Sequence, residues 1–548
     1  MKWKILSGFL ALLVVAACLP VPHEPGAWSE VDDWEYDSAP QSADGSRFGL
    51  VATKTMAMES SDIGFSVGGA KDADNFRANI RNGYLPMPTD ITSEGLFYDY
   101  YFDTGESDRC YELFCPSYSS AITPDPLSNE TEYYLSVGLN SGITDFKRKK
   151  LNLVVVLDIS GSMSSPFNRY YYDGIGNRIE NEEYTDDSKM EVARESVASL
   201  LDHLNDDDRF GMVLFDNNAH LAKPLGLVGR TDMEGIKEHI LDLEPRGGTH
   251  MSAGMKMGTE LFDDVEPEPE YENRIIFLTD AMPNIGETGE GSLLDILRDN
   301  SDDGIYTTFI GIGVDFNTEL VEMITKTRGA NYYSVHSARD FGTRMDMEFE
   351  FMVTPLVFDL ELILDARGYE IERVYGSPEA DEATGELMKV RTLFPSAKTD
   401  SGTRGGIVLL KLKKISDDAE LVLSVGYEDR DGNQFSNERS VEFTARGFDN
   451  NGIRKGVLLS RYADLMKNWI IDTRNDRDDV LHASVNFDDG IVVPQLGRWE
   501  RQSVSLSVSR HYERVFEDFL EHFEEEADII GDEALHQEID IMEKLTRS

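Results

Sequence analysis

Residues 151–162 read LNLVVVLDISGS, and this stretch decides the fold. Its first seven residues are nearly all apolar, which is typical of a strand buried on both faces of a parallel sheet. An Asp-x-Ser-x-Ser motif follows directly and supplies one carboxylate, Asp158, and two hydroxyls, Ser160 and Ser162. Because open α/β sheets bind ligands at the carboxyl ends of their strands, we expect these oxygen atoms at a functional edge.

The segments that follow alternate between strands and helices. The helix after the motif begins with Ser188 and Glu191, which are spaced as a capping box. Further strands are predicted at 210–215, 275–278 and 305–314, and further helices at 252–262, 292–298 and 318–327. This alternation predicts an α/β fold, a doubly wound and mostly parallel sheet covered on both faces.

The hydrophobic period changes to two after about residue 351, at 357–362, 407–412 and 420–425, and predicts a flanking antiparallel β-domain. Helices return from about residue 452, including one at 512–526. The predicted organisation is a signal peptide at 1–17, a flexible acidic spacer at 18–74, an N-terminal flanking domain at 75–148, the α/β domain at 149–347, a β-sandwich-like domain at 348–450 and a helical C-terminal region at 451–548.

Two more oxygen-bearing side chains follow other junctions of the sheet. Thr249 lies in a loop before a helix, and Asp280 comes at the end of the strand 275–278. Oxygen ligands of this kind suit a hard divalent cation, of which Mg²⁺ is the first choice and Mn²⁺ and Ca²⁺ are alternatives. The candidate metal ligands are Asp158, Ser160, Ser162, Thr249 and Asp280.

This set, in this order, resembles the metal-ion-dependent adhesion site of von Willebrand factor type A domains, over about 149–347. The resemblance implies that the five residues hold a divalent cation, some of them through water, and that an acidic side chain of a partner protein fills the open position. Ala281 departs from the pattern, since the family usually has Gly there; this bears on loop shape and removes no ligand. A metal that only stabilises the fold is the alternative.

The segment at 76–88 (FRANIRNGYLPMP) resembles one that precedes this domain in bacterial lipoproteins. Those lipoproteins are similar in layout to inter-alpha-trypsin inhibitor heavy chains and calcium-activated chloride-channel-like proteins. This resemblance says little about the partner.

The N-terminus has the pattern of an export signal. Lys2 and Lys4 precede a short apolar stretch, 5–17, and Cys18 follows two alanines as in a bacterial lipobox. We expect Cys18 to be acylated, which anchors the protein in the bacterial cell envelope. The outer membrane or cell surface is favoured, because the residue after Cys18 is Leu19 and not the Asp that would indicate retention at the inner membrane. An ordinary signal peptide with a stray cysteine is the alternative.

Cys110 and Cys115 enclose four residues, and in an exported chain this spacing predicts a local disulfide. No second Cys or His pair lies nearby, which argues against zinc. The insertion at 164–187 carries five aromatic residues beside the metal motif. It is either a recognition lid or a loop whose aromatics pack on the domain itself.

The chain has 102 acidic and 52 basic residues and a formal net charge of −50. This balance argues against nucleic acid as a partner, because phosphate binding needs clustered Lys and Arg. We therefore expect a non-enzymatic, metal-dependent protein-binding lipoprotein with an adhesion or scaffold role. Two alternatives are a structural or assembly subunit of an envelope complex and a metal-dependent hydrolase.

Overall fold

The computed structural model describes most of the chain between residues 30 and 547. The described residues are 30–37, 64–67, 69–70, 73–105, 113–142, 148–165, 170–172, 178–180, 187–266, 268–280, 292–312, 324, 326–335, 342, 345, 348–377, 387–396, 398–399, 402–416, 420–441, 443, 447–483 and 504–547.

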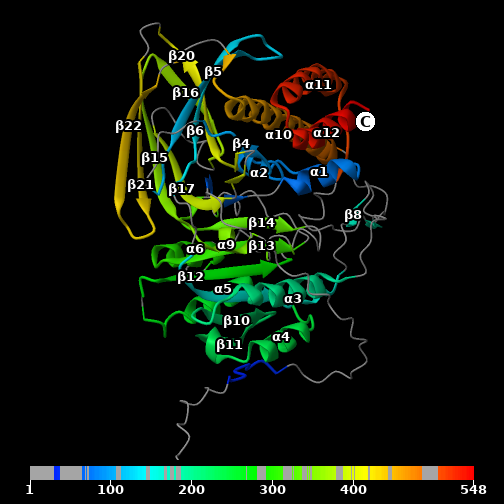
Figure 1. Cartoon of the computed structure of the whole chain (residues 1–548). Coiled ribbons are helices and arrows are strands. Elements are labelled where there is room, and N and C mark those ends of the chain that lie inside the picture. The colour runs from blue at the N-terminus through cyan, green and yellow to red at the C-terminus, as the bar shows by residue number, and fades with distance from the viewer. Residues whose placement is uncertain are drawn as a thin grey trace, which may run out of the picture.

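A seven-stranded sheet with the order β11-β10-β7-β12-β13-β14-β2 forms the centre of one half of the molecule (Figure 1). Its strands are β2 (Gly69–Ala70), β7 (Lys150–Asp158), β10 (Arg209–Phe215), β11 (Ala219–Leu227), β12 (Tyr271–Thr279), β13 (Ile305–Ile312) and β14 (Asn331–Val335). All neighbours pair in parallel except β11, which runs antiparallel to β10 at one edge. The predicted strand at 151–157 is the central strand β7.

Helices cover both faces of this sheet, and the alternation of side chains along β7 explains why. Val155 lies in one apolar core with Val197 and Ile236, whereas the next residue, Val156, lies in a second core with Met255 on the opposite face. The helices are α3 (Lys189–Leu200), α4 (Met233–Leu241), α5 (Met251–Glu260) and α6 (Leu293–Asp302). The predicted doubly wound α/β fold is confirmed. The helix predicted at 318–327 lies largely outside the described residues.

Two five-stranded antiparallel sheets pack face to face in the other half of the chain. One has the order β1-β17-β15-β21-β22 and the other β16-β20-β6-β5-β23. Their strands are β1 (Gly64–Val67), β5 (Ser117–Pro124), β6 (Thr131–Gly138), β15 (Val357–Arg367), β16 (Tyr369–Tyr375), β17 (Leu387–Ser396), β20 (Ile407–Lys414), β21 (Glu420–Asp429), β22 (Gln434–Val441) and β23 (Gly447–Phe448). Leu135 and Leu410 of one sheet share a core with Leu360 and Leu393 of the other, which makes a β-sandwich.

The residues before and after the α/β domain are interleaved in this sandwich. Strand β6 pairs with β20 along six residues, and β1 pairs with β17. The sequence pattern predicts separate units at 75–148 and 348–450, whereas the structure puts their strands in common sheets. Alternating apolar patterns identify strands but do not say which strands are neighbours, so the pattern alone could not reveal this arrangement.

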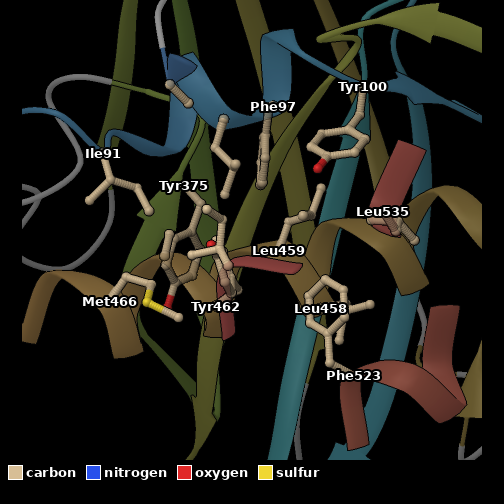
Figure 2. Packing of buried hydrophobic residues seen from close by; sticks show 14 of the residues in the cluster. Ile91, Phe97, Tyr100, Tyr375, Leu458, Leu459, Tyr462, Met466, Phe523 and Leu535 are labelled. Carbon is tan, nitrogen blue, oxygen red and sulfur yellow. The ribbon is translucent and has the colours of Figure 1, made fainter. Parts of the chain in front are cut away.

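Helices cover the outer face of the sheet that contains β6. They are α1 (Asp74–Arg81), α2 (Ser93–Tyr98), α10 (Asn451–Ala483), α11 (Arg510–Ile530) and α12 (His536–Thr546). Figure 2 shows how Phe97 of α2, Tyr375 of β16 and Leu459 of α10 gather in the core between them. The helix predicted at 512–526 lies within α11.

The remaining elements are short. They are α9 (Phe349–Val353), the strand pairs β3 (Tyr84–Leu85) with β24 (Val504–Ser505) and β8 (Tyr170–Tyr172) with β9 (Arg178–Glu180), the three-stranded group β4 (Tyr101–Phe102), β18 (Lys398–Thr399) and β19 (Gly402–Arg404), and the 3₁₀ turns η1 (Gly161–Ser164), η2 (Leu201–His203), η3 (Val228–Arg230) and η6 (Glu533–Leu535). Within the described part of the chain, every helix is too short or too polar to span a bilayer.

Parts of the predicted spacer at 18–74 are ordered against the rest of the molecule. Strands β1 and β2 add to two of the sheets, and residues 30–37 contact β11 and the start of α4. The prediction of a flexible spacer is therefore wrong for these segments. Few apolar residues mark them. Their order comes from backbone pairing, from ion pairs with distant elements, and from a few apolar side chains, such as Phe65 and Trp34, that pack on the cores.

Candidate metal centre

The metal-ligand candidates from the sequence come together at the carboxyl edge of the seven-stranded sheet. Strand β7 ends at Asp158, whose register partner on β10 is Phe215, and β12 ends at Thr279 beside it. The chain then continues into Asp280. Parallel pairing on both sides of β7 thus places the motif loop and Asp280 at one edge.

Asp158 is completely buried, and both of its carboxylate oxygens accept hydrogen bonds. Oδ1 accepts from the backbone N–H of Ser160 at 2.8 Å, and Oδ2 accepts from the hydroxyl of Thr279 at 2.7 Å. Burial raises the pKa of Asp158 to about 6, and the nearby Asp280 carboxylate adds to this while the hydrogen bonds oppose it. A cation at this edge would relieve the charge that burial makes unfavourable.

Three oxygen atoms form a short chain beside Asp158. The hydroxyl oxygens of Ser160 and Ser162 lie 2.9 Å apart, and the Ser162 hydroxyl donates to Oδ1 of Asp280 at 2.8 Å. Ser160 and Asp280 are buried, whereas Ser162 is exposed on the turn η1. The middle residue of this chain, Ser162, is therefore exposed to solvent on a turn that a ligand can reach.

The loop that carries Thr249 is held against the motif loop by two backbone hydrogen bonds. The N–H of Gly161 donates to the carbonyl of Gly247 at 3.0 Å, and the N–H of Arg246 donates to the carbonyl of Ile159 at 2.5 Å. Gly247 has a φ of +72°, which a side chain would strain. Thr249 is exposed and lies just before α5, in the loop that these two bonds hold against the motif loop.

A lysine completes the electrostatics of the site. The Nζ of Lys189, at the first position of α3, lies 2.8 Å from Oδ2 of Asp280, and both side chains are buried. Ser188 and Glu191 form the predicted capping box and fix the start of this helix. Lys189 therefore balances part of the negative charge of the two buried aspartates.

The family model of the von Willebrand factor type A domain matches residues 152–346, the segment that builds this sheet and this edge. These residues form a von Willebrand factor type A domain. Domains of this family typically mediate metal-dependent protein–protein interaction.

The chain is also similar to known proteins. The chain is 25% identical to human inter-alpha-trypsin inhibitor heavy chain H4 over 243 residues, which are 43% of this chain and 23% of that protein. It is 21% identical to mouse inter-alpha-trypsin inhibitor heavy chain H2 over 315 residues, 54% of this chain and 31% of that one. The chain thus spans less than a third of the length of these curated relatives.

Among solved structures, the chain is similar to a von Willebrand factor type A protein from Catenulispora acidiphila. The sequence identity is 16%, the TM-score is 0.39, and the match covers 62% of this chain and 74% of that one.

The donor set of the domain fits a hard divalent cation. Among the described residues, no three His, Cys, Asp or Glu side chains lie close enough together to hold a metal ion. The candidate ligands at this edge are instead two carboxylates and three hydroxyls. All of these ligand atoms are oxygens. Three of them, from Ser160, Ser162 and Asp280, are hydrogen-bonded to one another at 2.8–2.9 Å, and a bound cation would replace these hydrogen bonds. This chemistry matches Mg²⁺, which keeps several waters and takes few carboxylates.

Two residues near the site were missed by reasoning from the sequence. Thr279 supports Asp158, and its signal was its place as the last residue of a strand that meets β7. Lys189 forms an ion pair with Asp280. In the sequence, the capping box next to Lys189 indicates the start of a helix but not this ion pair. A hydroxyl or an ammonium next to a motif is too common to be assigned such a role from the sequence alone.

Several predicted positions lie outside the described residues: Cys18, Cys110, Ala281 and most of the insertion at 164–187. Within that insertion, β8 and β9 form a short antiparallel hairpin. Cys115 is disulfide-bonded, and its pairing with Cys110 stays a prediction.

Proposed function

We propose that this protein is an exported, lipid-anchored receptor of the bacterial cell envelope that captures an acidic side chain of a partner protein at a Mg²⁺ ion. The observation that carries the proposal is the chain of oxygens from Ser160 through Ser162 to Asp280 at an accessible edge of the sheet. Mn²⁺ or Ca²⁺ would use the same oxygens. The role is binding, with no catalytic residue assigned.

The charge of the ligand set favours an anionic ligand. Hydroxyls from Ser160, Ser162 and Thr249 neutralise none of the cation's charge, and Lys189 already occupies one oxygen of Asp280. A divalent ion held mainly by neutral oxygens stays electrophilic toward a carboxylate. The exposure of Ser162 and Thr249 leaves room for such a group to approach.

The net charge of −50 opposes an acidic partner at long range but does not prevent capture. At physiological ionic strength the Debye length is about 8 Å, so charges beyond that distance are largely screened. At contact distance the ion itself is the largest local charge. We therefore expect slow, salt-assisted association with affinity that depends on the metal.

The experiment is a pull-down from envelope extract with the full chain as bait, in Mg²⁺ and in EDTA. The proposal predicts that a partner is retained in Mg²⁺ and lost in EDTA and in a Ser160→Ala/Ser162→Ala variant. Partner capture that persists in EDTA would contradict the proposal and favour a structural or assembly role. The anchor is tested separately by lipid labelling, which Cys18→Ser should abolish.

A further inference from the structure

An acidic segment far from the domain in sequence lies along one edge of the von Willebrand factor type A domain. Residues 30–37 (EVDDWEYD), called the strap below, include five acidic and two aromatic residues. Figure 1 shows the strap in dark blue beside β11 and α4. Val31 accepts from the N–H of Asp232 at 3.0 Å and donates to Arg230 at 3.1 Å, and the N–H of Glu35 donates to Ala222 at 2.8 Å. The strap is thus held by backbone hydrogen bonds.

The side chains of the strap complement the surface formed by β11 and α4, called the β11 edge below, in shape and charge. Trp34 stacks on His239 with ring centroids 5.2 Å apart, and it packs with Tyr36 against the apolar core of the domain. Asp32 lies 2.9 Å from the imidazole of the same His239. An acidic residue and an aromatic one therefore share a single histidine.

The edge also holds a buried lysine that the strap neutralises. Lys223 of β11 has no exposed surface, and its Nζ donates to the carbonyls of Phe210 and Pro224. Its carboxylate partner in the described structure is Asp33 of the strap, at 3.0 Å. The carboxylate of Asp33 therefore supplies the negative charge that stabilises this buried ammonium, which makes the β11 edge suited to an acidic segment.

The end of the strap touches the loop that carries Thr249. The guanidinium of Arg246 lies 5.0 Å from the ring centroid of Tyr36, and its Nε donates to Asp216 at 3.1 Å. The backbone N–H of Arg246 is one of the two bonds that hold this loop against the metal motif. Tyr36 therefore packs on the first residue of the loop.

We propose that this edge is a docking site for an extended acidic and aromatic peptide, that residues 30–37 of the same chain occupy it, and that occupancy holds the Thr249 loop in place. Covalent attachment favours this occupant, since a tethered segment is present at an effective concentration in the millimolar range. The relevance of the Thr249 loop to metal binding rests on the proposed function, whereas docking of residues 30–37 does not.

The test is hydrogen exchange of the full chain in EDTA, followed by mass spectrometry. In a Trp34→Ala/Tyr36→Ala variant we expect loss of protection at the Asp232 amide, which bonds to the strap, and across 246–250. The matched control is Glu35→Gln, because Glu35 is exposed and, among the described residues, contacts this edge through its backbone N–H. Unchanged protection in the double variant would overturn the proposal.

A synthetic peptide of residues 30–37 separates a docking site from a general loss of stability. Added to the double variant, it should restore protection at both places, whereas a scrambled peptide should not. Failure of the native peptide to do so would overturn docking. The mass of the wild-type protein in solution tests the occupant: a dimer that forms with concentration and loses strap protection on dilution would overturn occupancy within one chain. Because EDTA is present throughout, these results hold whether or not the domain binds metal.

Discussion

Lys189 and Asp280 form a buried ion pair in which Nζ lies 2.8 Å from Oδ2, while the other oxygen of the same carboxylate accepts from Ser162. The aspartate that is expected to serve a metal is therefore already shared with a protein cation. A metal and a lysine at one carboxylate repel each other, so Lys189 sets how tightly a cation is held.

Lys189→Met should raise the affinity for Mg²⁺ by roughly fivefold, since removing a like charge from a partly screened site is worth about 1 kcal/mol. The same variant should lower the Tm in EDTA, because Asp280 loses its counter-ion. Calorimetry and thermal unfolding measure the two effects. Lys256→Met, on an exposed position of α5, is the control and should change neither. Weaker Mg²⁺ binding in Lys189→Met would contradict this account.

Asp158 gives the metal-free protein a characteristic pH dependence. Its pKa is about 6 in the folded protein and 3.8 ordinarily, so between these values the folded state binds the proton more tightly than the unfolded state. The contribution of this group to stability therefore falls as the pH rises from about 4 to 6, and stays low above that.

Asp158→Asn removes this titration without changing the size of the side chain. In EDTA, the difference in unfolding free energy between the variant and the wild type should grow in favour of the variant from pH 4 to pH 6 and then level off. Chemical denaturation at several pH values measures it. A difference that does not vary with pH would show that burial does not raise the pKa of Asp158.

Thr279→Val should lower the free energy of unfolding by about 1.5–3 kcal/mol, the range for a hydrogen bond to a charged group. The variant keeps the shape of the side chain but loses the hydroxyl that donates to Asp158. Thr307→Val is the matched control on the next strand, because the buried Thr307 hydroxyl has no hydrogen-bond partner within the described residues. Equal losses in both variants would contradict the supporting role of Thr279.

Helix α1 and the C-terminal helix α12 are joined by a buried cluster that a single change should disrupt. Glu538 of α12 accepts from Arg77 of α1 at 2.5 and 2.8 Å and from the Tyr100 hydroxyl at 2.7 Å. Glu538→Gln removes one of the two carboxylates that pair with the buried Arg77, and Asp99 remains at 2.6 Å. We therefore expect the free energy of unfolding to fall by less than the ~3–5 kcal/mol that an unpaired buried charge costs. Hydrogen exchange of α12 should become faster, whereas Glu543→Gln, which removes an exposed pair with Arg547, should leave it unchanged.

The parts of the fold that follow from local pattern could be predicted. The apolar run of β7 and the capping box at Ser188 are local features, and they placed the sheet and α3 correctly. The placement of Asp158 and Asp280 at one edge could be predicted, because parallel strands end at a common edge of the sheet. These predictions needed no knowledge of distant contacts.

The parts that depend on distant contacts could not be predicted. The pairing of β6 with β20 joins residues far apart along the chain, and either strand would satisfy the same alternating pattern with another neighbour. The strap has no apolar period at all. Its order depends on Lys223 being buried and on His239 being exposed to Trp34, and neither property can be read from the residue types.

The most direct test of the metal site is calorimetric titration of Mg²⁺ into the full chain after treatment with EDTA. An acidic protein binds Mg²⁺ weakly at many surface carboxylates, so the comparison with variants decides the result. We expect one tight site in the wild type and in Asp264→Asn, an exposed carboxylate outside the site, and its loss in Ser160→Ala/Ser162→Ala. Tight binding that survives in the double serine variant would contradict the account and place the metal elsewhere.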